Sequence, residues 1–165
     1  PGISACLDLL KSSDTPNKDR RAFMKAQIAF WLIGATDGHA KNFSLFLKPQ
    51  GRFALTPLYD ILSTQWQHDR RQVQRNAFRL AMAIGDNRRY KITGIAPRHF
   101  EQTARQAGLS VSALHEVMAD VVDQLPGAVH TVQTAIDEAV PEAMVESITT
   151  TAASRSEQIE IYLNG

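Results

Sequence analysis

Two aspartates and one asparagine stand in polar segments next to strongly apolar stretches of the chain. Asp37 and Asn42 are five positions apart in the string Asp-Gly-His-Ala-Lys-Asn, and Asp60 follows after two short apolar runs. Phosphoryl transfer from a nucleoside triphosphate needs a carboxylate to accept or orient the attacking hydroxyl, and hard oxygen ligands to hold Mg²⁺ on the phosphates. Asp37 suits the first role, and Asn42 and Asp60 suit the second. Lys41 or His39 could balance the charge on the moving phosphoryl group.

Each of these side chains also has a structural role open to it. Asp37 and Asn42 could cap the polar loop, and Asp60 could cap a helix that follows it. Lys41 could be solvated surface, and His39 could hydrogen-bond a neighbouring carboxylate. The Asp-x-x-x-x-Asn spacing equals that of the protein-kinase catalytic loop, and the two short runs followed by Asp60 favour chemistry over loop capping. A Mg²⁺-dependent phosphohydrolase that uses Asp37, His39 and Asp60 is a weaker alternative.

A buried helix is expected to lead into the polar loop. Apolar residues recur over 22–33 in a pattern typical of a helix that is covered on most sides near its end, which places Trp31 in the core. Asn17 is the expected N-cap, Asp19 lies in the first turn, and Gly34 is expected to end the helix. The candidate loop therefore starts from a rigid element.

The rest of the chain is expected to combine small hairpins with helices. The polar, basic stretch 63–76 predicts an exposed loop, and Tyr59 just before it is expected in the core. Turn residues and apolar periodicity predict the other elements, namely hairpins over 43–47 with 53–55 and over 78–84 with 90–92, and helices over 97–106, from Ser110 to a break at Pro126-Gly127, and over 142–163 as one or two helices. The fold class is therefore mainly α, with one or two small β-hairpins beside the polar loop.

Length and composition predict one folded domain. The chain has 165 residues, of which 44% are apolar and 21% are charged. Cys6 is the single cysteine, so an internal disulfide is excluded. The longest apolar run, Ile28 to Ala35, is too short to span a bilayer, so we expect a cytoplasmic protein without membrane contact. The chain begins Pro-Gly without a methionine or signal peptide, which is typical of a processed chain or a piece of a longer one.

The charges are distributed unevenly along the chain. Residues 67–106 carry nine basic and three acidic side chains, whereas residues 107–165 carry one basic and nine acidic side chains. The two regions could form solvated faces that attract each other. Alternatively, the basic region could meet an anionic partner such as nucleic acid or an acidic protein.

Two motifs resemble those of a known kinase family. The stretch from Trp31 to Ser44 is similar to the catalytic loop of HipA-type kinases, and the stretch from Leu55 to Ser63 resembles their metal-binding motif. Leu80-Ala-Met82 and Pro97-Arg-His-Phe100 are also similar to the family. The resemblance covers most of the chain and is weakest at 65–76 and in the acidic tail.

The resemblance implies an activity and roles for particular residues. HipA-type proteins are serine/threonine protein kinases that act as the toxin of a toxin–antitoxin pair. They restrain growth, which leads to persistence, by phosphorylating a protein of the translation apparatus. Asp37 would be the catalytic base, and Asn42 and Asp60 would hold Mg²⁺. The residues that would line the phosphates of ATP are His39, Ala40, Lys41, Asn42, Tyr59 and Asp60.

The resemblance also implies partners and a missing part. The partners would be a small HipB-like DNA-binding antitoxin and operator DNA, for which Arg98 and Arg105 are candidate phosphate contacts. Residues 1–165 would form a kinase-like C-terminal lobe, because the 36 residues before Asp37 are too few for an N-terminal ATP-binding lobe. We therefore expect the isolated chain to be inactive. The alternative is a non-catalytic module that binds an antitoxin or DNA.

Overall fold

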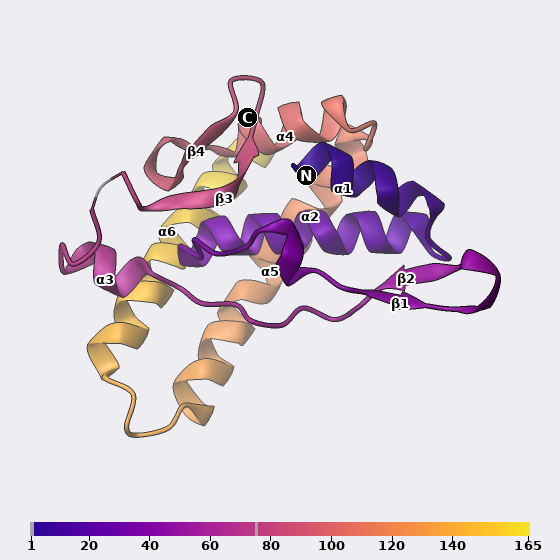
Figure 1. Cartoon of the computed structure of the whole chain (residues 1–165). Coiled ribbons are helices and arrows are strands. Elements are labelled where there is room, and N and C mark those ends of the chain that lie inside the picture. Colours follow the sequence, from indigo (N-terminus) through magenta and orange to yellow (C-terminus); the bar gives the residue numbers. More distant parts are fainter. Residues whose placement is uncertain (1, 75) are drawn as a thin grey trace.

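The structure is a computed structural model that describes residues 2–74 and 76–165 (Figure 1). In chain order its helices and strands are α1 (Ile3–Leu9), α2 (Pro16–Ile33), β1 (Leu45–Leu47), β2 (Phe53–Leu55), α3 (Gln65–Asp69), β3 (Arg79–Ile84), β4 (Arg89–Lys91), α4 (Pro97–Gln106), α5 (Val111–Ala135) and α6 (Glu142–Asn164). The strands form two separate antiparallel pairs, β1 with β2 and β3 with β4. The expected class, mainly α with one or two small hairpins, is confirmed, and there are two hairpins among the described residues.

Helix α2 runs through the middle of the molecule and contacts both long C-terminal helices, α5 and α6 (Figure 1). Its buried side chains include Phe23, Ile28 and Trp31, which confirms the expected burial of Trp31. The Trp31 ring lies 5.6 Å from the ring of Phe100 in α4. Each such side chain contributes roughly 1.5–3 kcal/mol when fully buried. The helix that leads into the candidate loop is therefore anchored in the core.

The two ends of α2 are set by different local signals. The helix begins at Pro16 with Thr15 as its N-cap, so the prediction of Asn17 as N-cap is wrong by two positions. Pro is favoured in the first turn of a helix, which explains why α2 begins at Pro16 and not after Asn17. Gly34 ends the helix as expected, with φ 69° and ψ 39°, a left-handed conformation that suits glycine.

The stretch 63–76 is not simply an exposed loop. It contains α3, and Gln65 at the start of that helix is only 3% exposed. The prediction is therefore wrong at α3, because contacts with distant parts of the chain cover this polar segment. Residue 75, within the same stretch, lies outside the described residues.

The expected break at Pro126-Gly127 is also wrong, because α5 continues through Pro126 to Ala135. A proline inside a helix removes one backbone hydrogen bond and costs about 3 kcal/mol. Leu125 packs against the hydrophobic core, and the second half of α5 continues beside α6. Tertiary contact thus overrides the local signal. Among the expected C-terminal elements, the Ser110 cap is confirmed, since its Oγ accepts a hydrogen bond from the amide of Ala113 at 3.1 Å.

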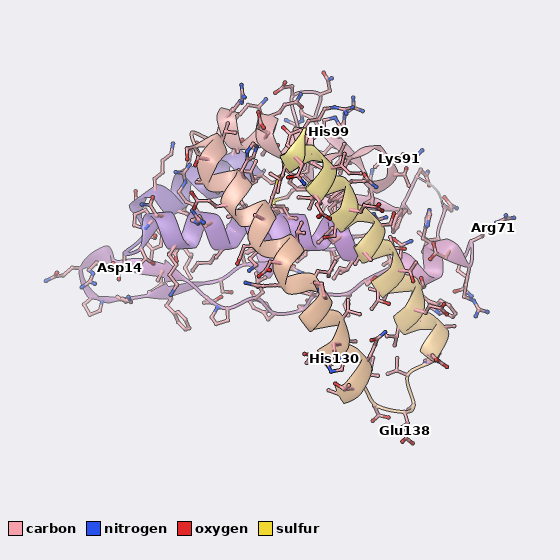
Figure 2. All side chains as sticks on the ribbon, turned by 180° about the vertical axis from the view of Figure 1, so that it is seen from behind. Asp14, Arg71, Lys91, His99, His130 and Glu138 are labelled. Atoms are coloured by element: carbon pink, nitrogen blue, oxygen red, sulfur yellow. The ribbon has the colours of Figure 1, made fainter. Side chains whose placement is uncertain are left out.

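Helices α5 and α6 form a long antiparallel pair whose far ends project from the body, with Glu138 at the tip (Figure 2). Two acidic residues of α5 meet basic residues of α2: Glu116 lies 2.7 Å from Arg21, and Asp120 lies 2.5 Å from Lys25. These acidic side chains therefore pair with α2 and not with the basic region 67–106. Within 2–74 and 76–165, no helix is both long and apolar enough to cross a membrane.

Candidate active site

The polar loop leaves the end of α2 and presents Asp37 to solvent. The Asp37 side chain is 63% exposed, and its Oδ1 lies 3.5 Å from Nε2 of His39. A single 3₁₀ turn, Ala40–Asn42, follows; Lys41 is exposed there, while Asn42 is only 8% exposed. The loop therefore holds the accessible carboxylate of Asp37 and the buried side-chain amide of Asn42. The Asp37 carboxylate is also the neighbour that a structural role for His39 would need.

Gly38 allows the loop to lie close against the core. A Cβ at this position would lie 2.3 Å from Cδ2 of Phe30, well inside van der Waals contact. The Phe30 ring is buried and lies 6.0 Å from the ring of Phe43 on the other side of the loop. Any larger residue at 38 would displace the loop or the ring. Gly38 follows directly on the candidate base in the sequence, but its close approach to Phe30 is visible only in the structure.

The segment after β2 returns to the end of α2. Ser63 donates from Oγ to the carbonyl oxygen of Ile33 at 2.5 Å, and the amide of Thr64 donates to that of Gly34 at 3.0 Å. Ala35 and Ser63 also form an isolated antiparallel bridge. These contacts satisfy carbonyl groups that a helix end leaves without partners. They fix one end of the 56–64 segment beside the start of the polar loop.

The other end of the 56–64 segment is fixed to the far end of the loop. The amide of Thr56 donates to the carbonyl oxygen of Ser44 at 3.0 Å. The hydroxyl of Tyr59 lies 2.6 Å from Oγ of Ser44 and 3.4 Å from the carbonyl oxygen of Lys41. Tyr59 is exposed, so its expected place in the core is wrong. The segment that carries Asp60 is therefore attached to the loop on both sides of Asp60.

Asp60 itself has a left-handed backbone, with φ 55°. This conformation costs a non-glycine residue roughly 1–2 kcal/mol, although aspartate and asparagine tolerate it better than most. Strained residues of this kind are concentrated at functional sites, where the surrounding contacts hold them. The alternative in which Asp60 caps the following helix is wrong, because Thr64 is the N-cap of α3.

The hairpin between the two segments is clamped at its outer end. Both carboxylate oxygens of Asp14 are used: Lys48 lies 2.5 Å from one, and Arg52 contacts both at 3.0 and 3.1 Å. These two cations lower the pKa of the Asp14 carboxyl to about 2. Deeper in the fold, Oδ2 of Asp19 accepts a hydrogen bond from the amide of Leu55 at 3.0 Å. The hairpin is thus held against the start of α2.

Two buried polar atoms of the loop lack protein partners. Nδ2 of Asn42 and Nδ1 of His39 are buried without a hydrogen bond from the described residues. A buried donor without an acceptor costs about 1–3 kcal/mol. Phosphate oxygens would supply the acceptor for Asn42, and its amide oxygen is a hard ligand that Mg²⁺ accepts. The loop therefore fits a magnesium nucleotide.

The metal-ligating side chains are few. Among the residues described, no three His, Cys, Asp or Glu side chains come together as a metal site. A Mg²⁺ ion on nucleotide phosphates needs only one or two protein ligands, since phosphates and water supply the rest. Asn42 and Asp60 are the two side chains that would supply these ligands.

The two candidate DNA contacts lie apart from this loop, on α4. Arg98 is exposed, and Nη2 of Arg105 lies 2.6 Å from Oε1 of Glu101, one helical turn away. Figure 2 shows Lys91 and Arg71, two other cations of the basic region, on one side of the molecule. The structure thus attaches the segment that carries Asp60 to the loop that carries Asp37 and Asn42, and it places Arg98 and Arg105 on a different element.

Known proteins are similar to this chain in sequence and in fold. A protein of Sinorhizobium fredii named "Putative kinase Y4mE" is 26% identical over 165 residues, which are 99% of this chain and 37% of that protein. A chain from the Shewanella oneidensis MR-1 complex of the toxin–antitoxin proteins HipA and HipB with operator DNA matches all of this chain with a TM-score of 0.82 and 21% identity, and the match covers 38% of that chain. The chain thus spans little more than a third of each. The family model described as the HipA-like C-terminal domain matches residues 2–129, so the chain belongs to that family.

Proposed function

We propose that this chain is the C-terminal catalytic lobe of a HipA-type serine/threonine protein kinase, which transfers the γ-phosphoryl group of ATP to a protein hydroxyl. One observation carries the proposal: the 56–64 segment is bonded to the loop on both sides of Asp60. Asp60 is thereby held beside the loop that carries Asp37 and Asn42. The family membership and the kinase name of the Sinorhizobium relative support the same conclusion.

The proposed roles follow from exposure and chemistry. The accessible carboxylate of Asp37 accepts the proton of the attacking serine or threonine hydroxyl. The hydroxyl oxygen then bonds to the γ-phosphorus as the bond between that phosphorus and ADP breaks. Asn42 and Asp60 would hold Mg²⁺, which would neutralise phosphate charge when bound. Lys41 is exposed next to them and adds positive charge. His39, Ala40 and Tyr59 complete the lining of the phosphates.

A group of exposed apolar side chains favours a second lobe over this site. They lie on β1 and in the 56–64 segment and are Phe46, Leu47, Leu58, Tyr59, Ile61 and Leu62. Leu47 is 83% exposed. Large exposed apolar side chains gathered in one region mark an interaction surface. We propose that an N-terminal ATP-binding lobe, supplied by a longer form of the chain or by another chain, covers them.

The test compares the isolated chain with a form joined to an ATP-binding lobe. We expect the isolated chain to bind Mg·ATP weakly and to transfer no phosphate, because it lacks the lobe that holds the nucleotide. The joined form should transfer label from γ-labelled ATP to serine or threonine, and chelation of Mg²⁺ should stop it. Robust transfer by the isolated chain, or none by the joined form under any metal condition, would contradict the proposal.

The proposed partners are a protein of the translation apparatus as substrate, a HipB-like antitoxin and operator DNA, in the cytoplasm. The Shewanella complex contains HipB and operator DNA, which supports the last two. The exposed cations of the basic region also favour an alternative, a non-catalytic module that binds DNA or an antitoxin. These cations include Arg79, Arg88, Arg89, Lys91 and Arg98.

Salt dependence distinguishes direct DNA contact from none. If Arg98 contacts phosphate, the complex of the protein, its antitoxin and operator DNA should weaken steeply as salt rises, and Arg98→Ala should lower the slope of log K against log[salt] by about one. Arg105→Ala should have less effect, because Glu101 already pairs with Arg105. Arg21→Ala, on α2, is the control. A slope that Arg98→Ala leaves unchanged would exclude this contact.

A further inference from the structure

Arg155 in α6 is buried although it is the single basic residue of 107–165. Arg155 is 9% exposed, and its guanidinium carbon lies 6.0 Å from the ring of Phe78. One nitrogen, Nη1, donates to the carbonyl oxygens of Trp31 at 2.8 Å and Leu32 at 3.0 Å. The other, Nη2, donates to Oε1 of Gln65 at 3.1 Å. One side chain thus joins the end of α2 to the start of α3.

The charge of Arg155 is expensive to bury. Burial lowers its pKa to about 10, so the guanidinium stays protonated at neutral pH. Among the described residues no carboxylate forms a direct ion pair with it, and the charge of Asp69 offsets only part of the cost of its burial. The C-terminal end of α2 offsets part of this cost, since the helix dipole places negative charge there. A neutral side chain would fill the same space with less penalty, which points to a positional role.

Further hydrogen bonds extend this link back to α6. Nε2 of Gln65 donates to Oδ1 of Asp69 at 2.8 Å, and Oγ of Ser147 donates to Oδ2 of the same carboxylate at 2.6 Å. The pKa of Asp69 is lowered, because these hydrogen bonds and that of His68 outweigh its burial. Helix α3 is therefore held by α6 at both of its ends.

We propose that Arg155 is a positioning residue that fixes the loop carrying Asp37 and Asn42 against the segment carrying Asp60. The carbonyl groups that Arg155 holds lie just before Gly34, three positions ahead of Asp37, and the α3 it holds follows directly on the segment of Asp60. Releasing the guanidinium would free both segments at their common support. Its catalytic consequence rests on the proposed function, whereas the link itself does not.

Amide hydrogen exchange in the 165-residue chain tests the link directly. In Arg155→Ala, the amides of Thr64 and Asn42, which bond the carbonyl oxygens of Gly34 and His39, should lose protection by about tenfold or more. The amide of Leu114, bonded to Ser110 in α5, serves as an internal control and should change little. Millimolar guanidinium ion, far below denaturing concentrations, should restore part of the protection. Unchanged exchange at Thr64 and Asn42, or an equal loss at Leu114, would overturn the proposal.

Arg155→Lys keeps the test decisive if the alanine variant does not fold. An ammonium group keeps the charge but cannot bridge two carbonyl groups and Gln65 with a planar fork. We therefore expect an intermediate loss of protection at Thr64 and Asn42. Exchange identical to that of the wild type in Arg155→Lys would overturn the proposal. Arg21→Lys is the matched control, because Arg21 is a partly exposed arginine of α2.

Activity separates this proposal from the proposed function. In the form joined to an ATP-binding lobe, Arg155→Ala should lower kcat by about tenfold or more, and guanidinium ion should restore part of it, while Arg21→Lys stays active. An inactive wild type with the exchange result intact would refute the kinase and leave the link standing. An active wild type with a fully active Arg155→Ala would refute the positioning role alone.

Discussion

Replacing Asp37 by asparagine is expected to reduce phosphoryl transfer by about 10²- to 10⁴-fold in the form joined to an ATP-binding lobe, which is the range for loss of a general base. Asparagine has the same shape but cannot take up the hydroxyl proton. The Asp37 side chain is 63% exposed, and the one short contact of its carboxylate among the described residues is with Nε2 of His39 at 3.5 Å, so little stability depends on it. Steady-state transfer of label from γ-labelled ATP, together with thermal unfolding, measures both effects.

The matched control is Asp123→Asn, an exposed aspartate of α5 far along the chain from the loop. It should keep full activity and the same unfolding temperature. If Asp37→Asn also kept full activity, Asp37 would not be the base. If Asp37→Asn lowered the unfolding temperature so far that the protein was largely unfolded in the assay, the loss of activity would be structural. That result would give the role proposed for Asp37 no support.

Replacing Asp60 by asparagine should have the second largest effect. Asparagine tolerates the left-handed backbone that Asp60 adopts at φ 55°, so the substitution removes charge without adding strain. Because a neutral amide is a weaker ligand for Mg²⁺ than a carboxylate, we expect transfer to fall by about 10²-fold at low Mg²⁺. Titration with Mg²⁺ at fixed ATP should recover part of the rate.

Asp60→Ala separates the charge from the backbone. It removes the same ligand and adds the left-handed strain of roughly 1–2 kcal/mol, so it should lower both the activity and the free energy of unfolding. Asp60→Asn should lower the activity alone. A Mg²⁺ dependence in Asp60→Asn identical to that of the wild type would show that Asp60 does not hold the metal.

The sequence was informative wherever structure depends on neighbouring residues. Gly34 ends α2, Ser110 caps α5, and the turn residues locate both hairpins, because each signal acts within a few positions. The polar loop could be placed after a buried helix for the same reason. The order of Asp37, Asn42 and Asp60 around a hairpin was therefore readable.

The contacts that bring these residues together were not readable. Ser63 and Thr64 lie about 30 positions from the carbonyl groups they hold, and Arg155 lies more than 120 from its own. A lone arginine in an acidic tail looks like surface, and only the packing of α6 on α2 buries it. The same applies to Gln65, which is buried at the start of α3 in a stretch that the sequence predicts to be an exposed loop. Long-range packing decided each of these positions.

Single-turnover transfer with saturating Mg·ATP tests the central claim most directly, because it separates nucleotide binding from chemistry. In the form joined to an ATP-binding lobe, the wild type should move the labelled γ-phosphoryl group to a serine or threonine hydroxyl. Asp37→Asn should bind Mg·ATP with unchanged affinity and transfer the label at least about 10²-fold more slowly. Equal single-turnover rates in the two proteins would contradict the assignment of this loop as the site of phosphoryl transfer.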